Sequence, residues 1–243
     1  TGSPSRCHTA TGLYRYAKPF ERRGKRVIPR PVHFPPSHSN RASELFAGVV
    51  LTAGRSSRMG TPKALLTLQG VSFLRRIVDA MTVAGCRPVV VVTSSAADEE
   101  SGRRILAEAA RAGATTVVNP DPDSQQIDSL RVALRSLPAE VEGVVTAPVD
   151  SPGATPDVVA ALLAALREGA LIAVPSYEGR RGHPVAFSSR VFTELMTGDL
   201  PEGARTVIRR HEAEVVELPL AEPGVLLDVD TPGDYARLQG EAQ

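Results

Sequence analysis

The sequence predicts an α/β fold, a single three-layer α/β/α domain whose mostly parallel sheet is covered by helices on both faces. From Phe46 onward, short runs of β-branched residues alternate with segments of helical periodicity, which is typical of parallel sheets. The run of valines at 89–92 is continuously apolar, as in strands buried on both faces. The chain has 243 residues, enough for one domain of about 200 residues with a real core.

The elements follow from apolar runs and helix caps. The expected strands cover residues 46–53, 87–94, 114–120, 142–150, 170–176, 183–187, 214–220 and 224–230. A helix is expected to start at Thr155-Pro156-Asp157, between the fourth and fifth strands. The triplet combines a hydroxyl N-cap, a proline suited to the first helical position and an acid near the positive end of the helix dipole. Thr231-Pro232 repeats this start, and Asp234 completes a capping box there.

The first 45 residues differ from the rest. They hold nine Lys or Arg residues and two Glu residues, a net charge of about +7, which leaves about −6 for the remainder. They also contain six prolines and no apolar periodicity, so they cannot offset the entropy of ordering. We expect a disordered, basic, Pro-rich extension at 1–45 and one domain at 46–243. A solvated tail is favoured over contact of residues 20–26 with RNA or anionic lipid.

Overall composition narrows the class of protein. Apolar residues make up 42% and charged residues 23%, with net charge +1, which argues against a nucleic-acid or membrane partner. No segment approaches the roughly 18 apolar residues of a membrane span. Cys7 and Cys86 alone give neither a disulfide framework nor metal-ligand spacing. We therefore expect a cytoplasmic protein.

The loop after the first strand carries the first functional signal. In open α/β sheets, ligands bind beyond the carboxyl ends of the strands, and this loop commonly holds phosphate. Gly54 and Gly60 allow close backbone approach, and Arg58 and Lys63 supply positive charge, so the loop suits a triphosphate. Its spacing fits neither the Walker nor the dinucleotide pattern. A solvent-exposed basic turn is the alternative.

Five segments resemble the MobA-like nucleotidyltransferases, most closely the molybdenum cofactor cytidylyltransferases. They are LTAGRSSRMGTPKALL (51–66), NPDPDSQQIDSLRVAL (119–134), TAPVDSP (146–152), GRRGHPVAF (179–187) and LLDVDTPGDY (226–235). The resemblance implies a Rossmann-like nucleotidyltransferase domain that moves NMP from an NTP to a phosphorylated acceptor such as molybdopterin cofactor and releases pyrophosphate. CTP is the favoured donor and GTP the alternative. A molybdoenzyme that receives the cofactor is the further partner.

Carboxylates at strand ends are the candidate metal ligands. Mg²⁺, with Mn²⁺ as the alternative, takes hard oxygen ligands and few protein carboxylates. Asp150 ends the expected fourth strand, where it either binds the metal or caps the following turn. Asp228 and Asp230 alternate, so they share one face of an extended segment. The family pattern favours Asp230 as the second ligand, with Asp228 as the alternative.

The resemblance also assigns the remaining site residues. The catalytic set is Lys63, Arg58 and Asp150, because the two cations would neutralise charge on the α-phosphate and the leaving pyrophosphate. The expected nucleotide-binding residues are Leu51, Thr52, Ala53, Gly54, Arg58, Lys63, Asp128, Ser129 and Leu130. Gly182 and His183 are expected at the acceptor, although packing at a strand entry explains His183 equally well.

One departure from the family pattern keeps other functions open. Residues 124–128 are bulkier and more polar than the small, glycine-containing residues that cytidylyltransferase relatives show there. A non-catalytic nucleotide-binding accessory protein for molybdoenzyme maturation is therefore one alternative. A flavin- or nicotinamide-dependent oxidoreductase is the other, but it leaves Asp150 and Asp230 without a role.

Overall fold

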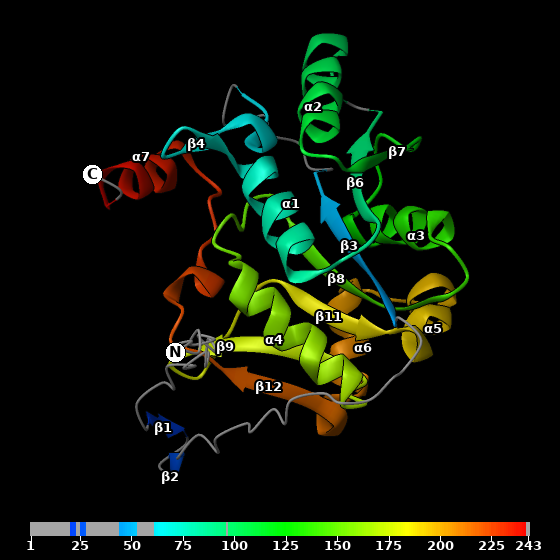
Figure 1. Ribbon diagram of the computed structural model, residues 1–243, viewed down its shortest axis with the longest axis vertical. Coiled ribbons are helices and arrows are strands. Elements are labelled where there is room, and N and C mark those ends of the chain that lie inside the picture. Colours follow the sequence, from blue (N-terminus) through cyan, green and yellow to red (C-terminus); the bar gives the residue numbers. More distant parts are fainter. Residues whose placement is uncertain (1–19, 23–24, 28–43, 53–60, 96, 242–243) are drawn as a thin grey trace, which may run out of the picture.

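The computed structural model describes residues 20–22, 25–27, 44–52, 61–95 and 97–241. It confirms the α/β class and the mostly parallel sheet (Figure 1). The main strands are β3 (Leu45–Leu51), β6 (Val89–Ser94), β7 (Thr115–Asn119), β8 (Val141–Pro148), β9 (Ile172–Tyr177), β11 (Val185–Ser188) and β12 (Val215–Pro219). Seven of the eight expected strands are thus present, with ends displaced by a few residues.

The sheet runs β9-β11-β8-β3-β6-β7, and β12 and the short β10 (Arg180–Arg181) also pair with β9. Pairing is parallel between β3 and β6, β3 and β8, β6 and β7, and β9 and β12. β11 runs antiparallel to both β8 and β9. Because Leu51 of β3 lies opposite Pro148 of β8, the carboxyl ends of these two central strands meet at one edge of the sheet.

Helices cover both faces. On one face, α1 (Phe73–Ala84) and α4 (Pro156–Arg167) lie side by side, and α2 (Glu99–Arg111) and α7 (Pro232–Glu241) add to the same core. On the other face pack α3 (Gln126–Ser136), α5 (Phe192–Thr197) and α6 (Ala204–Arg210). The predicted cap of α4 is confirmed, since Thr155 Oγ1 accepts the Val158 N–H at 3.3 Å.

The prediction of a strand at 224–230 is wrong. The 3₁₀ turn η4 (Pro223–Leu226) covers the first half of this segment, and residues 227–230 follow without pairing to a strand. Its backbone bonds loops instead, because His183 N–H donates to Val225 O at 2.8 Å and Val229 N–H donates to Asp150 O at 3.0 Å. Val225 and Val229 are buried, so the segment has a strand's apolar alternation without a strand's pairing.

Smaller elements complete the described chain. The 3₁₀ turns η1 (Lys63–Leu65), η2 (Ser189–Val191) and η3 (Glu212–Glu214) join larger elements, and β4 (Thr67–Leu68) and β5 (Val71–Ser72) form a hairpin. Within the N-terminal segment, β1 (Phe20–Arg22) and β2 (Lys25–Val27) pair antiparallel. The division into extension and domain stays a prediction. None of the helices in the described ranges has both the length and the apolar character of a membrane span.

Candidate active site

Three carboxylates converge at the carboxyl edge of the sheet. Asp150, Asp228 and Asp230 each offer an oxygen, and these oxygens all lie within 4.8 Å of one another. Asp150 stands in the turn that follows β8, two residues beyond Pro148, whereas the sequence analysis expected the strand itself to end at Asp150. We call these three residues the acidic cluster. The structure thus brings together both alternatives, Asp228 and Asp230, as the alternation predicted.

Two glycines allow the C-terminal residues to reach Asp150. A Cβ on Gly182 would lie 2.0 Å from Val225 O, and a Cβ on Gly153 would lie 2.2 Å from Gly224 O. Any side chain at either position would push η4 away from the sheet edge. With η4 in place, Val229 N–H bonds Asp150 O, and the aspartates on either side of buried Val229 face the turn after β8.

The start of α7 holds Asp230 from its other side. Asp234 Oδ2 accepts the Thr231 N–H at 2.8 Å and the Asp230 N–H at 3.2 Å, while Thr231 Oγ1 accepts the Asp234 N–H at 3.2 Å. This confirms the predicted capping box. Hydrogen bonds from the Thr231 side chain and backbone lower the pKa of Asp234 to about 2. The box therefore stays ionised and bonded near neutral pH.

Lys63 enters the acidic cluster from η1. Its Nζ donates to Asp230 Oδ1 at 2.7 Å and to Asp150 Oδ2 at 3.2 Å. The Lys63 side chain is 15% exposed, and its neighbours Ala64 and Leu66 are buried, which fixes the turn. Burial lowers the pKa of Lys63, but the hydrogen bonds and charges of Asp230 and Asp150 outweigh it and raise the pKa overall. The residue is thus a permanent cation at neutral pH.

The hairpin after Lys63 is tied to α7. Tyr235 Oη donates to Thr67 O at 2.8 Å and accepts the Thr67 N–H at 3.3 Å, and its ring packs edge-on against Phe73. Because Tyr235 follows Asp230 by five residues and Thr67 follows Lys63 by four, this contact links the segment that carries the lysine to the segment that carries the aspartate.

The acidic cluster fits a divalent cation. Burial, followed by the charges of Asp150 and Asp230, raises the pKa of Asp228, so the three carboxylates repel one another. Their donor set consists of hard oxygens, and it already holds one positive charge, the Lys63 ammonium. Crowded carboxylates that are relieved by a cation suit Mg²⁺ or Mn²⁺ better than softer metals.

His183 lies near the acidic cluster. Burial lowers the pKa of His183, the charge of Asp150 raises it and the charge of Arg205 lowers it further, with a net lowering. His183 therefore lies within electrostatic reach of a catalytic candidate on one side and of exposed Arg205 of α6 on the other. The sequence analysis missed Arg205. The only signal for it was the basic character of residues 205–210, which ordinary surface arginines also explain.

Comparison with known proteins identifies the family. Residues 48–215 match the MobA-like NTP transferase domain. The chain belongs to the MobA-like NTP transferase family. A relative named molybdenum cofactor guanylyltransferase, from Rhizobium leguminosarum bv. trifolii, is 32% identical over 79% of this chain and 91% of its own length. The 2-C-methyl-D-erythritol 4-phosphate cytidylyltransferase of Streptomyces avermitilis is 32% identical over 54% of this chain and 53% of its own.

Solved structures agree. The crystal structure of Rv0371c from Mycobacterium tuberculosis H37Rv has a TM-score of 0.71 and 32% identity, and covers 82% of this chain and 99% of that one. A complex of the same mycobacterial protein with manganese has a TM-score of 0.67 and 31% identity, and covers 81% and 98% of the two chains. The chain of 243 residues is therefore a MobA-like nucleotidyltransferase, and the family resemblance drawn from its motifs is confirmed.

The expected nucleobase contacts of this MobA-like enzyme lie at the start of α3. Asp128 accepts the Gln125 N–H at 3.0 Å and pairs with Arg131 at 3.1 Å, so it caps the helix. Ser129 is fully buried and accepts from Asn119 Nδ2 at 3.0 Å, and Leu130 lies in the core. Only Asp128 of the three leaves its side chain accessible, so a contact of Ser129 or Leu130 with a nucleotide would be made through the backbone.

The loop that the sequence analysis assigns to the triphosphate is described only at its two ends. Leu51 is buried in the core, and Thr52 Oγ1 donates to Val92 O at 2.9 Å. Ala53, Gly54 and Arg58 lie outside the described residues. Their assignment to the nucleotide stays a prediction.

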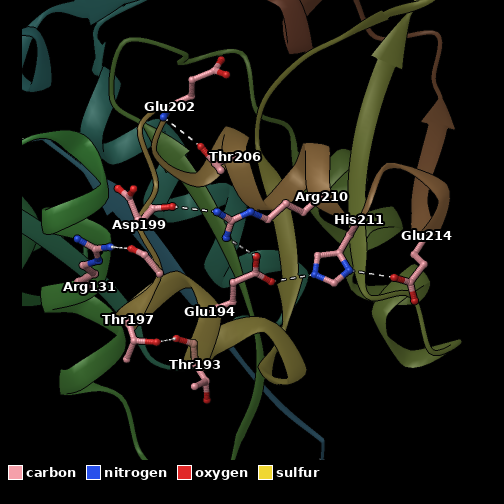
Figure 2. A network of polar contacts seen from close by, with 11 residues as sticks. Arg131, Thr193, Glu194, Thr197, Asp199, Glu202, Thr206, Arg210, His211 and Glu214 are labelled. Carbon is pink, nitrogen blue, oxygen red and sulfur yellow. Dashed lines mark hydrogen bonds and ion pairs between the residues drawn. The ribbon is translucent and has the colours of Figure 1, made fainter.

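A second set of polar contacts lies on α5, α6 and η3 and reaches α3 (Figure 2). Arg131 of α3 donates to Gly198 O at 2.7 Å, Arg210 donates to Glu194 at 3.0 Å, and His211 bridges Glu194 and Glu214 at 2.8 and 2.9 Å. These contacts join α3, whose first turn is capped by Asp128, to α6, which carries Arg205. They therefore fix the helix that carries the expected nucleobase contacts relative to α6.

Proposed function

We propose that this nucleotidyltransferase moves NMP from an NTP to a phosphorylated acceptor of the molybdenum cofactor type, with release of pyrophosphate. The observation that carries the proposal is the Lys63 ammonium held among three carboxylates at the carboxyl edge of the central strands. Anionic phosphates and a divalent cation need such a mixture of fixed charges. The relative named molybdenum cofactor guanylyltransferase, aligned over 79% of this chain, supports the acceptor class.

We assign the metal to the acidic cluster, with Mg²⁺ as the ion and Mn²⁺ as the alternative. Asp150, Asp228 and Asp230 would hold it, and it would neutralise charge on the phosphate oxygens of the NTP. Lys63 lies beside these carboxylates, at the end of the loop that we assign to the triphosphate, where Arg58 is the second cation. As pyrophosphate leaves, negative charge grows on it, and a fixed ammonium gains interaction energy in the transition state.

The acceptor is assigned to the side of Gly182, His183 and Arg205. A phosphate oxygen of the acceptor would attack the α-phosphorus of the NTP, forming a new P–O bond while the bond to the β-phosphate oxygen breaks and pyrophosphate takes the electron pair. An acceptor phosphate is ionised at neutral pH, so this step needs no general base. Exposed Arg205 offers an anion a positive charge, and His183 with its lowered pKa offers a neutral hydrogen-bonding ring.

The proposal has two forms, which differ in whether the donor nucleotide is CTP or GTP. The motifs favour CTP, with the base near Asp128, Ser129 and Leu130. The Rhizobium relative that aligns over 79% of this chain is named a guanylyltransferase, which favours GTP. Selectivity is a ratio of kcat/KM values, so the two nucleotides must be compared in competition rather than one at a time.

The test is incorporation of nucleotide with all four NTPs present, metal added and molybdenum cofactor as acceptor. We expect pyrophosphate release that needs both acceptor and divalent metal, and a dinucleotide product by mass spectrometry. Asp150→Asn should lower turnover about 100-fold, the order of effect of losing one preorganised electrostatic contact. The matched control is Asp157→Asn, the same change at an exposed acid in the first turn of α4. NTP binding without turnover would instead show the accessory protein.

A further inference from the structure

Lys63 occupies the place that a divalent cation would take among the carboxylates. Its Nζ lies 2.7 Å from Asp230 and 3.2 Å from Asp150, two of the three residues whose oxygens lie within 4.8 Å of one another. A metal ion and an ammonium cannot both sit between the same two carboxylate oxygens, because each needs their lone pairs and the two cations repel.

We propose that Lys63 is a built-in competitor of the divalent cation, and that its release from Asp150 and Asp230 couples metal binding to NTP binding. This inference rests on the proposed function for the identity of the nucleotide. Without nucleotide, the ammonium satisfies the acidic cluster and weakens metal binding. With nucleotide, the displaced ammonium gains phosphate oxygens as new partners, so metal and NTP bind together more tightly than either binds alone.

The residue type supports this role. Lys63 is the only lysine after Lys25, and every other basic residue from 44 to 243 apart from histidine is an arginine. An ammonium is a compact, rotatable point charge on a flexible stem, which exchanges one set of oxygens for another at little geometric cost. A guanidinium would form a planar, bidentate pair that is harder to release. The chain thus places the one lysine of residues 44–243 where exchange of partners is required.

The surrounding contacts confine the exchange to the side chain. Leu66 N–H donates to Lys63 O at 3.1 Å, Leu65 N–H donates to Pro62 O at 2.9 Å, and the Tyr235 contact with Thr67 holds the following hairpin. The backbone at residue 63 therefore stays in place while the side chain moves. Asp150 is likewise held by the bond from Val229 N–H to its carbonyl. The acidic cluster is preformed, and only its occupant changes.

The experiment measures Mn²⁺ binding to the full chain by electron paramagnetic resonance of free Mn²⁺, first without nucleotide. Lys63→Met removes the ammonium and keeps the length of the stem, so it should bind Mn²⁺ alone about tenfold more tightly than the wild type. Lys63→Arg keeps the charge and is harder to release, so it should bind Mn²⁺ no more tightly than the wild type. Arg103→Met, which breaks an exposed ion pair with Glu99 on α2, controls for the change in net charge and should have no effect. Asp230→Asn should weaken binding.

The second part of the experiment repeats the Mn²⁺ titration with nucleotide present. Adding CTP or GTP without acceptor should tighten Mn²⁺ binding in the wild type by a larger factor than in Lys63→Met. The Mn²⁺-induced rise in Tm should be larger in Lys63→Met than in the wild type, which also shows that the variant is folded. Unchanged or weaker Mn²⁺ binding by Lys63→Met, or no Mn²⁺ binding by either protein, overturns the inference. Tighter binding without any nucleotide transfer would overturn the proposed function alone.

Discussion

Gly182 is the position where a single methyl group should disassemble the active site. In Gly182→Ala the new Cβ would lie 2.0 Å from Val225 O and 2.6 Å from Val225 C, short of ordinary contact near 3.4 Å by about 1.4 Å for the oxygen. Both atoms belong to the backbone, so no rotamer change relieves the clash. Residues 225–230 must move away from the sheet edge, and Asp228 and Asp230 move with them.

The cost can be worked from the contacts. Overpacking costs about 1–3 kcal/mol, and the hydrogen bond from His183 N–H to Val225 O adds about 1 kcal/mol if it is lost. We expect a loss of about 2–4 kcal/mol in the free energy of unfolding. For a domain of this size that corresponds to a Tm lower by about 4–16 °C. A misplacement of about 1 Å at a catalytic group also costs up to about 100-fold in rate.

The matched control is the same change at Gly102 within α2. A Cβ there meets nothing within 4 Å, and the helix gains about 1 kcal/mol from alanine, so Tm should rise by about 2–4 °C. Calorimetry and Mn²⁺ binding on the two variants check both signs. If Gly182→Ala melts with the wild type and binds Mn²⁺ equally well, the contact between Gly182 and Val225 does not hold the acidic cluster together.

Two further predictions concern histidines. In metal-free protein, Arg205→Gln should raise the pKa of His183 and Asp150→Asn should lower it, as followed by NMR titration of the imidazole; equal signs would show that the ring does not lie between these charges. His211, whose pKa is raised by Glu214 and Glu194, should stabilise the fold relative to His211→Asn most strongly below about pH 6.5, its unfolded value, and lose that advantage as pH rises through the folded pKa. Urea unfolding from pH 5 to 9 measures this difference, and a gap that widens with pH would contradict it.

The strands and caps were predictable because their causes are local. A run such as residues 89–92 is apolar on both faces wherever it lies in the sheet, and β6 is buried as expected. Thr155 and Thr231 cap their helices with side chains that reach only three residues along the chain. Residues 224–230 show the limit of this argument. Burial alternates in any extended segment packed against a core, whether or not a neighbouring strand accepts its hydrogen bonds.

The long-range part of the site was not predictable in the same way. Alternation placed Asp228 and Asp230 on one side, and the structure confirms that both reach Asp150. The sequence could not show that Gly153 and Gly182 admit η4, because their contacts lie 71 and 43 residues away along the chain. Ser129 and Leu130 carried the family pattern for the nucleobase, yet both are buried by the amphipathic character of α3.

The acidic cluster is held by backbone contacts rather than by its own charges. Three carboxylates this close repel, as the raised pKa of Asp228 shows, so electrostatics alone would drive them apart. What opposes this is the bond from Val229 to Asp150, the close approach at the two glycines and the capping box that anchors Asp230. The fold therefore maintains a concentrated negative charge that only a cation relieves. Lys63 supplies that cation before substrate arrives, and the same electrostatic need makes the site receptive to a metal carried in with the nucleotide.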